Sequence, residues 1–228
     1  MKTLLATGMV LGCALLVAGC SNPVLDEIVK LKDPAVTDAA KCGFEPNVLK
    51  QNKCDKVKLE CTELHSLRAT ACHKLAAAGG SNASAARQRT LTAYDAGTAT
   101  LPTQVEPKLA VALEEATFNA LVGEAEAAIM RRTGAPDNAK PPLNERILAA
   151  ANQLNALPKP AAAKNFARYY RAEVLANTAA LLPDAQQCAP LSEATALLKP
   201  QIVDLELQNR VGQLQSDITS LRSSAGCT

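Results

Sequence analysis

The run CDKVKLECTELHSLRATACHKLAAA, residues 54–78, organises the chain because it holds three cysteines and neither proline nor glycine. It belongs to a longer segment, Asn47–Ala78, whose pattern predicts one continuous helix. At 100° per residue, the spacings place Cys54, Cys61 and Cys72 on one face of that helix. Successive cysteines would then lie about 10 and about 16 Å apart, whereas bridged Cα atoms lie within about 7 Å. We therefore expect no disulfide between any two of these three.

The N-terminus has the pattern of an export signal. Lys2 supplies a charged region, the apolar and small residues Leu4–Gly12 follow it, and the segment closes on Val17-Ala18-Gly19-Cys20. That tetrad resembles the lipobox of bacterial lipoproteins, in which the cysteine is acylated and becomes the mature N-terminus. An ordinary signal peptide that happens to contain a cysteine, or an uncleaved membrane anchor, are the alternatives.

The resemblance implies a lipid anchor on Cys20. Lipoproteins of this family usually carry a diacylglyceryl thioether and an amide-linked acyl group, such as palmitate, and more than one chain is what stable anchoring requires. Ser21 stands where relatives retained in the inner membrane typically have Asp. The implied location is therefore the outer membrane, with the domain facing the periplasm.

The remaining cysteines predict three disulfides. Cys13 leaves with the signal and Cys20 takes the lipid, and an even number of cysteines in an exported chain is typical of a disulfide framework. The candidates are Cys42, Cys54, Cys61, Cys72, Cys188 and Cys227. Each helix cysteine would take one of the other three, which would tie both ends of the domain to the helix. If the helix starts near Asp55 instead, a local Cys42–Cys54 bridge is favoured.

Composition predicts an all-α fold. Ala, Leu, Glu, Lys and Gln are abundant and β-branched runs are few. Removal of the signal, residues 1–19, leaves about 210 residues, enough for one sizeable domain. We expect a lipidated tether and short helix over residues 20–33, followed by a single all-α periplasmic domain over 34–228. That domain is predicted to be an irregular bundle of five to seven helices, arranged as stacked αα-hairpins and stabilised by disulfides.

Helical patterns and their proline and glycine boundaries define the elements. Besides Asn47–Ala78, the predicted helices are Val24–Leu31, Ala35–Lys41, Ala83–Ala96, Lys108–Arg132, Leu143–Leu157, Ala161–Leu182, Leu191–Leu198 and Gln201–Ser223. The last of them has the most regular apolar spacing, at Leu207, Val211, Leu214, Ile218 and Leu221. Two heptads are too few for a coiled-coil dimer, so this seam is expected to pack within the bundle.

Two hairpins, Leu67–Pro102 and Tyr169–Pro200, weakly resemble tetratricopeptide units. Each lacks the large aromatic residue that opens such a repeat and the Leu-Gly pair that follows it. The resemblance therefore implies stacked helical hairpins and no specific partner.

The stretch Thr133–Pro142 is the most loop-like in the chain. Its turn-forming residues are Gly134, Pro136, Asp137, Asn138, Pro141 and Pro142. Loops carry function without disturbing a core, so these residues are the predicted partner-contact site.

No motif for catalysis, a metal or a cofactor stands out. His65 lies on the cysteine face, but the cysteines are too far apart for a tetrahedral zinc site. The pairs Glu114-Glu115 and Glu124/Glu126 are interpreted as solvated surface carboxylates, and Tyr169-Tyr170 as one buried and one half-exposed ring. We predict no enzyme activity, no metal and no cofactor. With 24 basic and 22 acidic residues interspersed, no nucleic-acid partner is expected either.

The function favoured by the sequence is a protein-binding, assembly or structural accessory factor of an envelope complex. Its partners would be the membrane, through the N-terminal lipid, and an envelope protein; the oligomeric state is not defined by the sequence. The alternatives are a periplasmic inhibitor or immunity-type lipoprotein and a cell-wall hydrolase without a recognisable motif.

Overall fold

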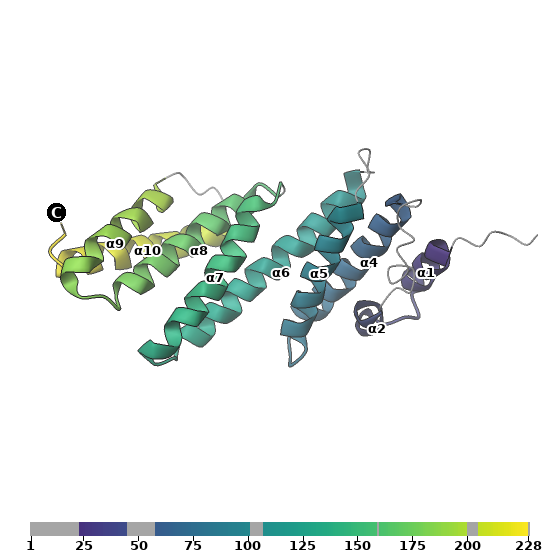
Figure 1. Ribbon diagram of the computed structural model, residues 1–228, viewed down its shortest axis with the longest axis horizontal. Helices are drawn as coiled ribbons and strands as arrows, with labels where there is room; N and C mark the ends of the chain where they lie inside the picture. Colours follow the sequence, from purple (N-terminus) through teal and green to yellow (C-terminus); the bar gives the residue numbers. More distant parts are fainter. Residues whose placement is uncertain (1–22, 45–57, 101–106, 159, 200–204, 228) are drawn as a thin grey trace, which may run out of the picture.

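The computed structural model describes residues 23–44, 58–100, 107–158, 160–199 and 205–227. Within these ranges the chain forms nine α-helices and no strand, so the all-α prediction is confirmed. Eight of the nine lie within residues 34–228, where five to seven were expected. The helices are α1 (Pro23–Lys32), α2 (Asp38–Gly43), α4 (Lys58–Ala77), α5 (Ala83–Thr100), α6 (Pro107–Thr133), α7 (Lys140–Ala156), α8 (Ala162–Ala179), α9 (Asp184–Leu198) and α10 (Leu205–Ser224). Figure 1 shows them as an elongated array, with α1 near one end and α9 and α10 at the other.

Helices that follow one another in the chain pack side by side. The strongest pairs are α4 with α5, α6 with α7, α7 with α8, and α8 with α9, which is the predicted stacking of hairpins. The 27-residue α6 also contacts α4 and α5, so it belongs to both halves of the array. This long helix is the reason that the two halves form one continuous body (Figure 1).

The buried apolar side chains are distributed unevenly between those halves. One large cluster joins the second part of α6 to α7, α8, α9 and α10. The first half has three small clusters instead, between α1 and α4, among α4, α5 and α6, and around Cys42 and Cys72. The seam of α10 lies in the large cluster, with Leu207, Val211, Leu214 and Ile218 buried, which confirms its packing within the chain.

Two helices begin earlier than predicted, and each contains a proline that the prediction places before its start. α7 begins at Lys140, with Pro141 and Pro142 in its first turn, where backbone N–H groups have no intrahelical partner in any case. α9 begins at Asp184 and contains Pro190. The amide of Gln187 donates to the carbonyl of Leu182 at 2.8 Å, which ties the start of α9 to the preceding turn.

The disulfides correct the predicted connectivity. Cys42 pairs with Cys72 across α2 and α4, with Cα atoms 4.6 Å apart, and Cys188 pairs with Cys227 across α9 and the end of α10, at 5.4 Å. The prediction that three helix cysteines each take one of Cys42, Cys188 and Cys227 is therefore wrong, because the C-terminal pair lies at the far end of the array from α4 (Figure 1).

The third bridge is described in part. Cys61 is disulfide-bonded, and its partner lies outside the described residues, as does Cys54. Since Cys72 is bonded to Cys42, neither Cys54 nor Cys61 pairs with it. The predicted absence of a Cys54–Cys61 bridge is not confirmed, because Cys54 is the one candidate of the six that the two described bridges leave for Cys61.

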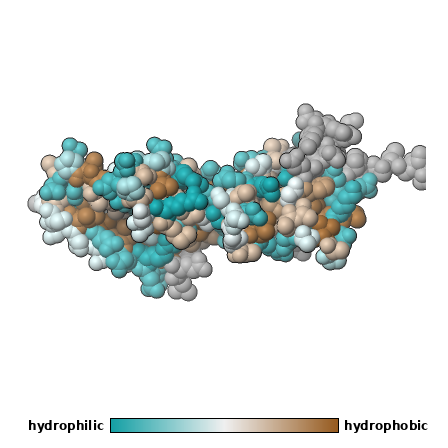
Figure 2. Space-filling view, turned by 90° about the horizontal axis from the view of Figure 1, so that it is seen from below, coloured by the Kyte–Doolittle hydropathy of each residue, from teal (hydrophilic) through white to brown (hydrophobic). Residues whose placement is uncertain are grey.

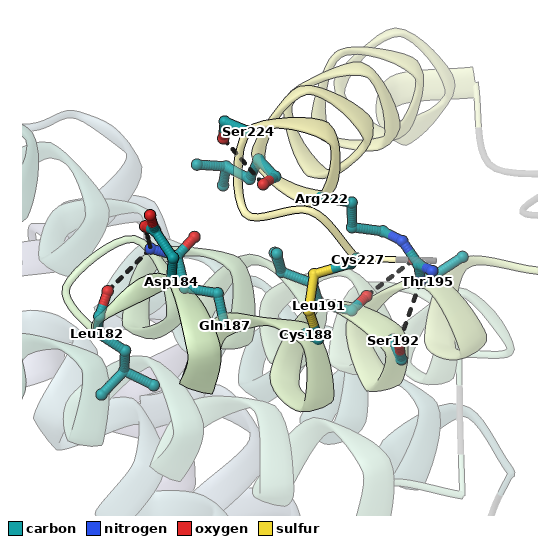
Figure 3. The surroundings of a disulfide bond; sticks show 11 residues. Leu182, Asp184, Gln187, Cys188, Leu191, Ser192, Thr195, Arg222, Ser224 and Cys227 are labelled. Atoms are coloured by element: carbon teal, nitrogen blue, oxygen red, sulfur yellow. Dashed lines mark hydrogen bonds between the residues drawn. A yellow bond between two sulfur atoms is a disulfide. The ribbon is translucent and has the colours of Figure 1, made fainter.

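Around the C-terminal disulfide, side chains of α9 and α10 meet (Figure 3). Arg222 donates from Nη1 to Oγ of Ser192 at 3.1 Å, close to the bond between Cys188 and Cys227. The bridge therefore secures the last turn of α10 against α9.

Candidate functional site

A groove runs between α5 and α7, with α6 as its floor. It consists of two adjoining hollows of about 180 and 400 Å³, which share Leu121 and Gln153 as lining residues. The α5 wall carries Gln88, Leu91, Tyr94 and Asp95, the floor carries Thr117, Leu121 and Glu124, and the α7 wall carries Arg146, Ala149, Ala150, Gln153, Ala156 and Leu157. We call this feature the α5–α7 groove.

The groove exists because α5 and α7 both pack on α6 while hardly touching each other. With no proline after Pro107, α6 is one uninterrupted helix, long enough to accept α5 on its first part and α7 on its second. The exposed flanks of α5 and α7 are left facing one another across it.

Glu124 holds the two walls in place. Its carboxylate accepts from Nε of Arg87 on α5 at 2.7 Å and from Nη2 of Arg146 on α7 at 2.9 Å, and its side chain is only 9% exposed. Gly123 makes room for this arrangement, since a Cβ there would lie 2.8 Å from Cδ of Arg87. Glu124 thus links α5 and α7 through two ion pairs, although these helices hardly contact each other directly.

The interpretation of Glu124 as a solvated carboxylate is therefore wrong. Its two arginine partners lie 37 and 22 residues away in sequence, so no local spacing could have indicated the pairing. In the sequence of a helix, a glutamate that becomes buried cannot be told from one that stays exposed unless its ion-pair partners are known.

The side chains that line the groove are of kinds that bind a protein segment through apolar contacts and hydrogen bonds. Leu91 gives apolar surface above the buried Leu121, while Gln88 and Gln153 bring amide groups that both donate and accept hydrogen bonds. Burial, followed by the charges of Glu114 and Asp95, raises the pKa of the Tyr94 phenol, which stays neutral. No nucleophile with an adjacent base occurs among these lining residues.

No family model, curated protein or solved structure matches the chain.

The predicted partner-contact loop lies at one end of the α5–α7 groove. Its residues are Gly134, Pro136, Asp137, Asn138, Pro141 and Pro142, and the structure leaves all six solvent-exposed. A 3₁₀ turn, η2 (Asp137–Ala139), shapes the loop, and Lys140 pairs with Asp137 at 2.8 Å. Arg146 of the groove follows Lys140 by six residues, about 9 Å along α7.

Both ends of this loop are pinned by one buried arginine. Nη1 of Arg132, just before the loop, donates to Oδ1 of Asn144, just after it, at 2.7 Å. Nη2 of the same guanidinium pairs with Glu173 on α8. Sequence reasoning missed this network, because Arg132 resembles any basic residue in the last turn of a helix.

A second cluster joins α6, α8 and α10. Glu126 accepts from both terminal nitrogens of Arg210, at 2.7 and 3.1 Å, and from the hydroxyl of Tyr170 at 2.5 Å. The Arg210 guanidinium lies 4.7 Å from the ring centre of Tyr169. Burial raises the pKa of Tyr170, and the charge of Glu126 raises it further, so the hydroxyl remains a donor. The cluster fastens α10 to α6 and α8.

Two predictions are corrected by this cluster. Glu126 is not a freely solvated carboxylate, since Arg210 and Tyr170 bind it. Tyr169 and Tyr170 are both buried, rather than one buried and one half-exposed.

His65 lies in the packing between α4, α5 and α6. It is 1% exposed, neither ring nitrogen has a hydrogen-bond partner among the described residues, and Gly97 and Leu113 pack close by. Burial, followed by the charge of Arg68, lowers the pKa of His65 to about 4, so the ring is neutral. Within the described residues no group of three or more His, Cys, Asp or Glu side chains could hold a metal ion.

Proposed function

We propose that this protein is a lipid-anchored envelope protein that binds a segment of a protein partner in the α5–α7 groove. The groove supports the proposal because it combines the half-buried side chain of Leu91 with hydrogen-bonding walls and holds these walls fixed through Glu124. Such a preorganised surface lowers the cost of ordering on binding. Accessory and assembly factors of envelope complexes act through contacts of this kind.

The anchor and the location rest on the sequence and on the redox chemistry. Val17-Ala18-Gly19-Cys20 supports acylation at Cys20, which lies outside the described residues. The disulfides Cys42–Cys72 and Cys188–Cys227 are compatible with an oxidising compartment such as the periplasm. Within the described part of the chain, no helix is long and apolar enough to span a bilayer.

The dimensions and charges of the groove define the class of segment that it fits. Its α7 wall extends from Arg146 to Leu157, about 16 Å, which equals three turns of a helix. Arg146, 45% exposed, stands at one end, and the exposed Asp95 lies toward the other. The expected occupant is a short amphipathic segment with apolar side chains against Leu91, an acidic group near Arg146 and a basic group near Asp95.

Gln153→Arg tests the proposal. Gln153 is exposed and lines both hollows, so an arginine there fills the groove without entering the core. Asn152→Arg is the matched control, because Asn152 is the exposed neighbour on α7, does not line either hollow, and receives the same charge and volume. Each variant, with the unchanged chain, is used to capture partners from detergent-solubilised membranes.

We expect Gln153→Arg to lose partners that Asn152→Arg retains, while the helical circular dichroism and the melting temperature of both match the unchanged chain. Equal capture of partners by the two variants would contradict binding in the α5–α7 groove. Turnover of isolated peptidoglycan by the purified protein would favour a hydrolase instead.

A further inference from the structure

The helix nearest the predicted lipid has an apolar face that remains exposed among the described residues. Val24, Ile28 and Leu31 of α1 are buried against α4. On the outer side, Leu25 is 47% exposed and Val29 is 67% exposed, one turn apart.

A third exposed apolar side chain lies at the same end of the molecule. Leu59 is in the first turn of α4, one turn before Glu63, which pairs with Lys32 of α1 at 2.5 Å. Among the described residues the large exposed apolar side chains are Leu25, Val29, Leu59 and Met130, so three of the four lie at this end. Hydrophobic surface is also visible near this end in Figure 2.

Chain length decides what can cover this face. Only Ser21 and Asn22 separate Cys20 from the start of α1 at Pro23. Three Cα–Cα steps span at most about 11 Å, so the start of α1 lies within that distance of the anchored cysteine. The polar headgroup layer is itself about 5–8 Å thick on each side of a bilayer. An acylated Cys20 therefore brings α1 to the membrane surface.

We propose that the outer face of α1 lies on the bilayer, with Leu25 and Val29 at the boundary between headgroups and acyl chains. The inference rests on the proposed acylation of Cys20. The exposed Lys30 lies about 100° around α1 from Val29, at the edge of this face, where the lysines of interfacial helices meet lipid phosphates. The lipid supplies the affinity, and the α1 face sets the orientation of the domain.

This orientation has a consequence for the rest of the array. With α1 on the membrane, the elongated body extends away from it, and α9 and α10 form the distal end (Figure 1). The α5–α7 groove lies between these ends, clear of the lipid and open to a partner in the aqueous phase.

Tryptophan fluorescence tests the contact, because the chain contains no Trp and each variant then has a single emitter. Val29→Trp places the probe on the α1 face, and Met130→Trp is the matched control on α6, where the side chain is 71% exposed. The full protein, purified from membranes with its lipid, is reconstituted into phosphatidylcholine and phosphatidylglycerol vesicles, with or without bromine on the upper acyl carbons. The mass of the N-terminal peptide reports acylation in the same samples.

We expect the tryptophan at position 29 to emit at shorter wavelength in vesicles and to lose much of its emission to the brominated lipid, while that at position 130 shows neither change. An acylated, vesicle-bound chain in which the two probes respond alike would overturn the membrane contact and leave the anchor standing. A peptide mass without lipid would overturn the anchor and the contact together.

Discussion

The two ends of the array are cross-linked in different surroundings. Cys42 and Cys72 are fully buried, in a cluster with little else than Ala86, Leu75 and Ala76. Cys188 and Cys227 are half-buried, at the edge of the large cluster that unites α6 to α10. The packing of α2 against α4 therefore depends on its covalent link, whereas the C-terminal end has a large core without its own.

Loop length alone does not separate the two bridges. The cysteines are 30 and 39 residues apart, for which the chain-entropy model gives about 4 kcal/mol in each case. Any difference in measured stability must come from the packing that remains when a bridge is removed.

Removal of the N-terminal bridge is expected to have the largest effect. In Cys42→Ala with Cys72→Ala, the six-residue α2 loses its one buried side chain and separates from α4, and we expect a cost of about 5 kcal/mol, from loop entropy and lost packing together. The matched pair, Cys188→Ala with Cys227→Ala, should cost no more than the loop entropy of about 4 kcal/mol, because the α10 seam and the Arg210–Glu126 contact still hold the helix. Urea unfolding followed by circular dichroism measures both, and equal losses would contradict the comparison.

Acid should weaken the N-terminal half next. The pKa of His65 is about 4 in the folded chain and near 6.5 when unfolded, so the unfolded chain binds more protons between these values. Stability is then complete above pH 6.5 and falls as pH drops toward 4, by at most about 3 kcal/mol. Urea unfolding at a series of pH values measures this loss.

His65→Leu is the control for this effect. The apolar side chain cannot take up a proton, so the loss between pH 6.5 and 4 should become smaller than in the unchanged chain. A profile that keeps its full slope in His65→Leu would assign the acid sensitivity to other groups.

Local pattern was sufficient for the helices and for the α10 seam. The spacing of Leu207, Val211, Leu214 and Ile218 is a property of one segment, and burial of that face requires no knowledge of its partner. The early start of α7 was missed because Pro141 and Pro142 were read as part of a loop, although a first turn accommodates proline.

The sequence did not predict which residues far apart in the chain pair with one another in the fold. The spacing along α4 limits which cysteines can meet, but the partner of Cys72 depends on where α2 lies in three dimensions. The same holds for the groove, since Arg87, Glu124 and Arg146 meet only after α5 and α7 have packed on α6. A lone carboxylate in a helical pattern does not specify which distant cations approach it.

The smallest stability effect is expected in the loop between α6 and α7, where it separates two possible contact surfaces. Shortening the loop would remove the first turn of α7, so we favour Asp137→Ala with Asn138→Ala, at exposed positions. The Asp137–Lys140 pair is a surface ion pair, and its loss should change the free energy of unfolding by less than about 0.5 kcal/mol.

Partner capture by this double variant, compared with Gln153→Arg, then tells the two surfaces apart. If the partner covers both the groove and the loop, which adjoin along the first two turns of α7, both variants should lose it without a change in melting temperature. Loss in Gln153→Arg alone confines the contact to the groove. Loss in the loop variant alone would move the contact to the loop and contradict the groove, because a segment held between α5 and α7 could not ignore an arginine at position 153.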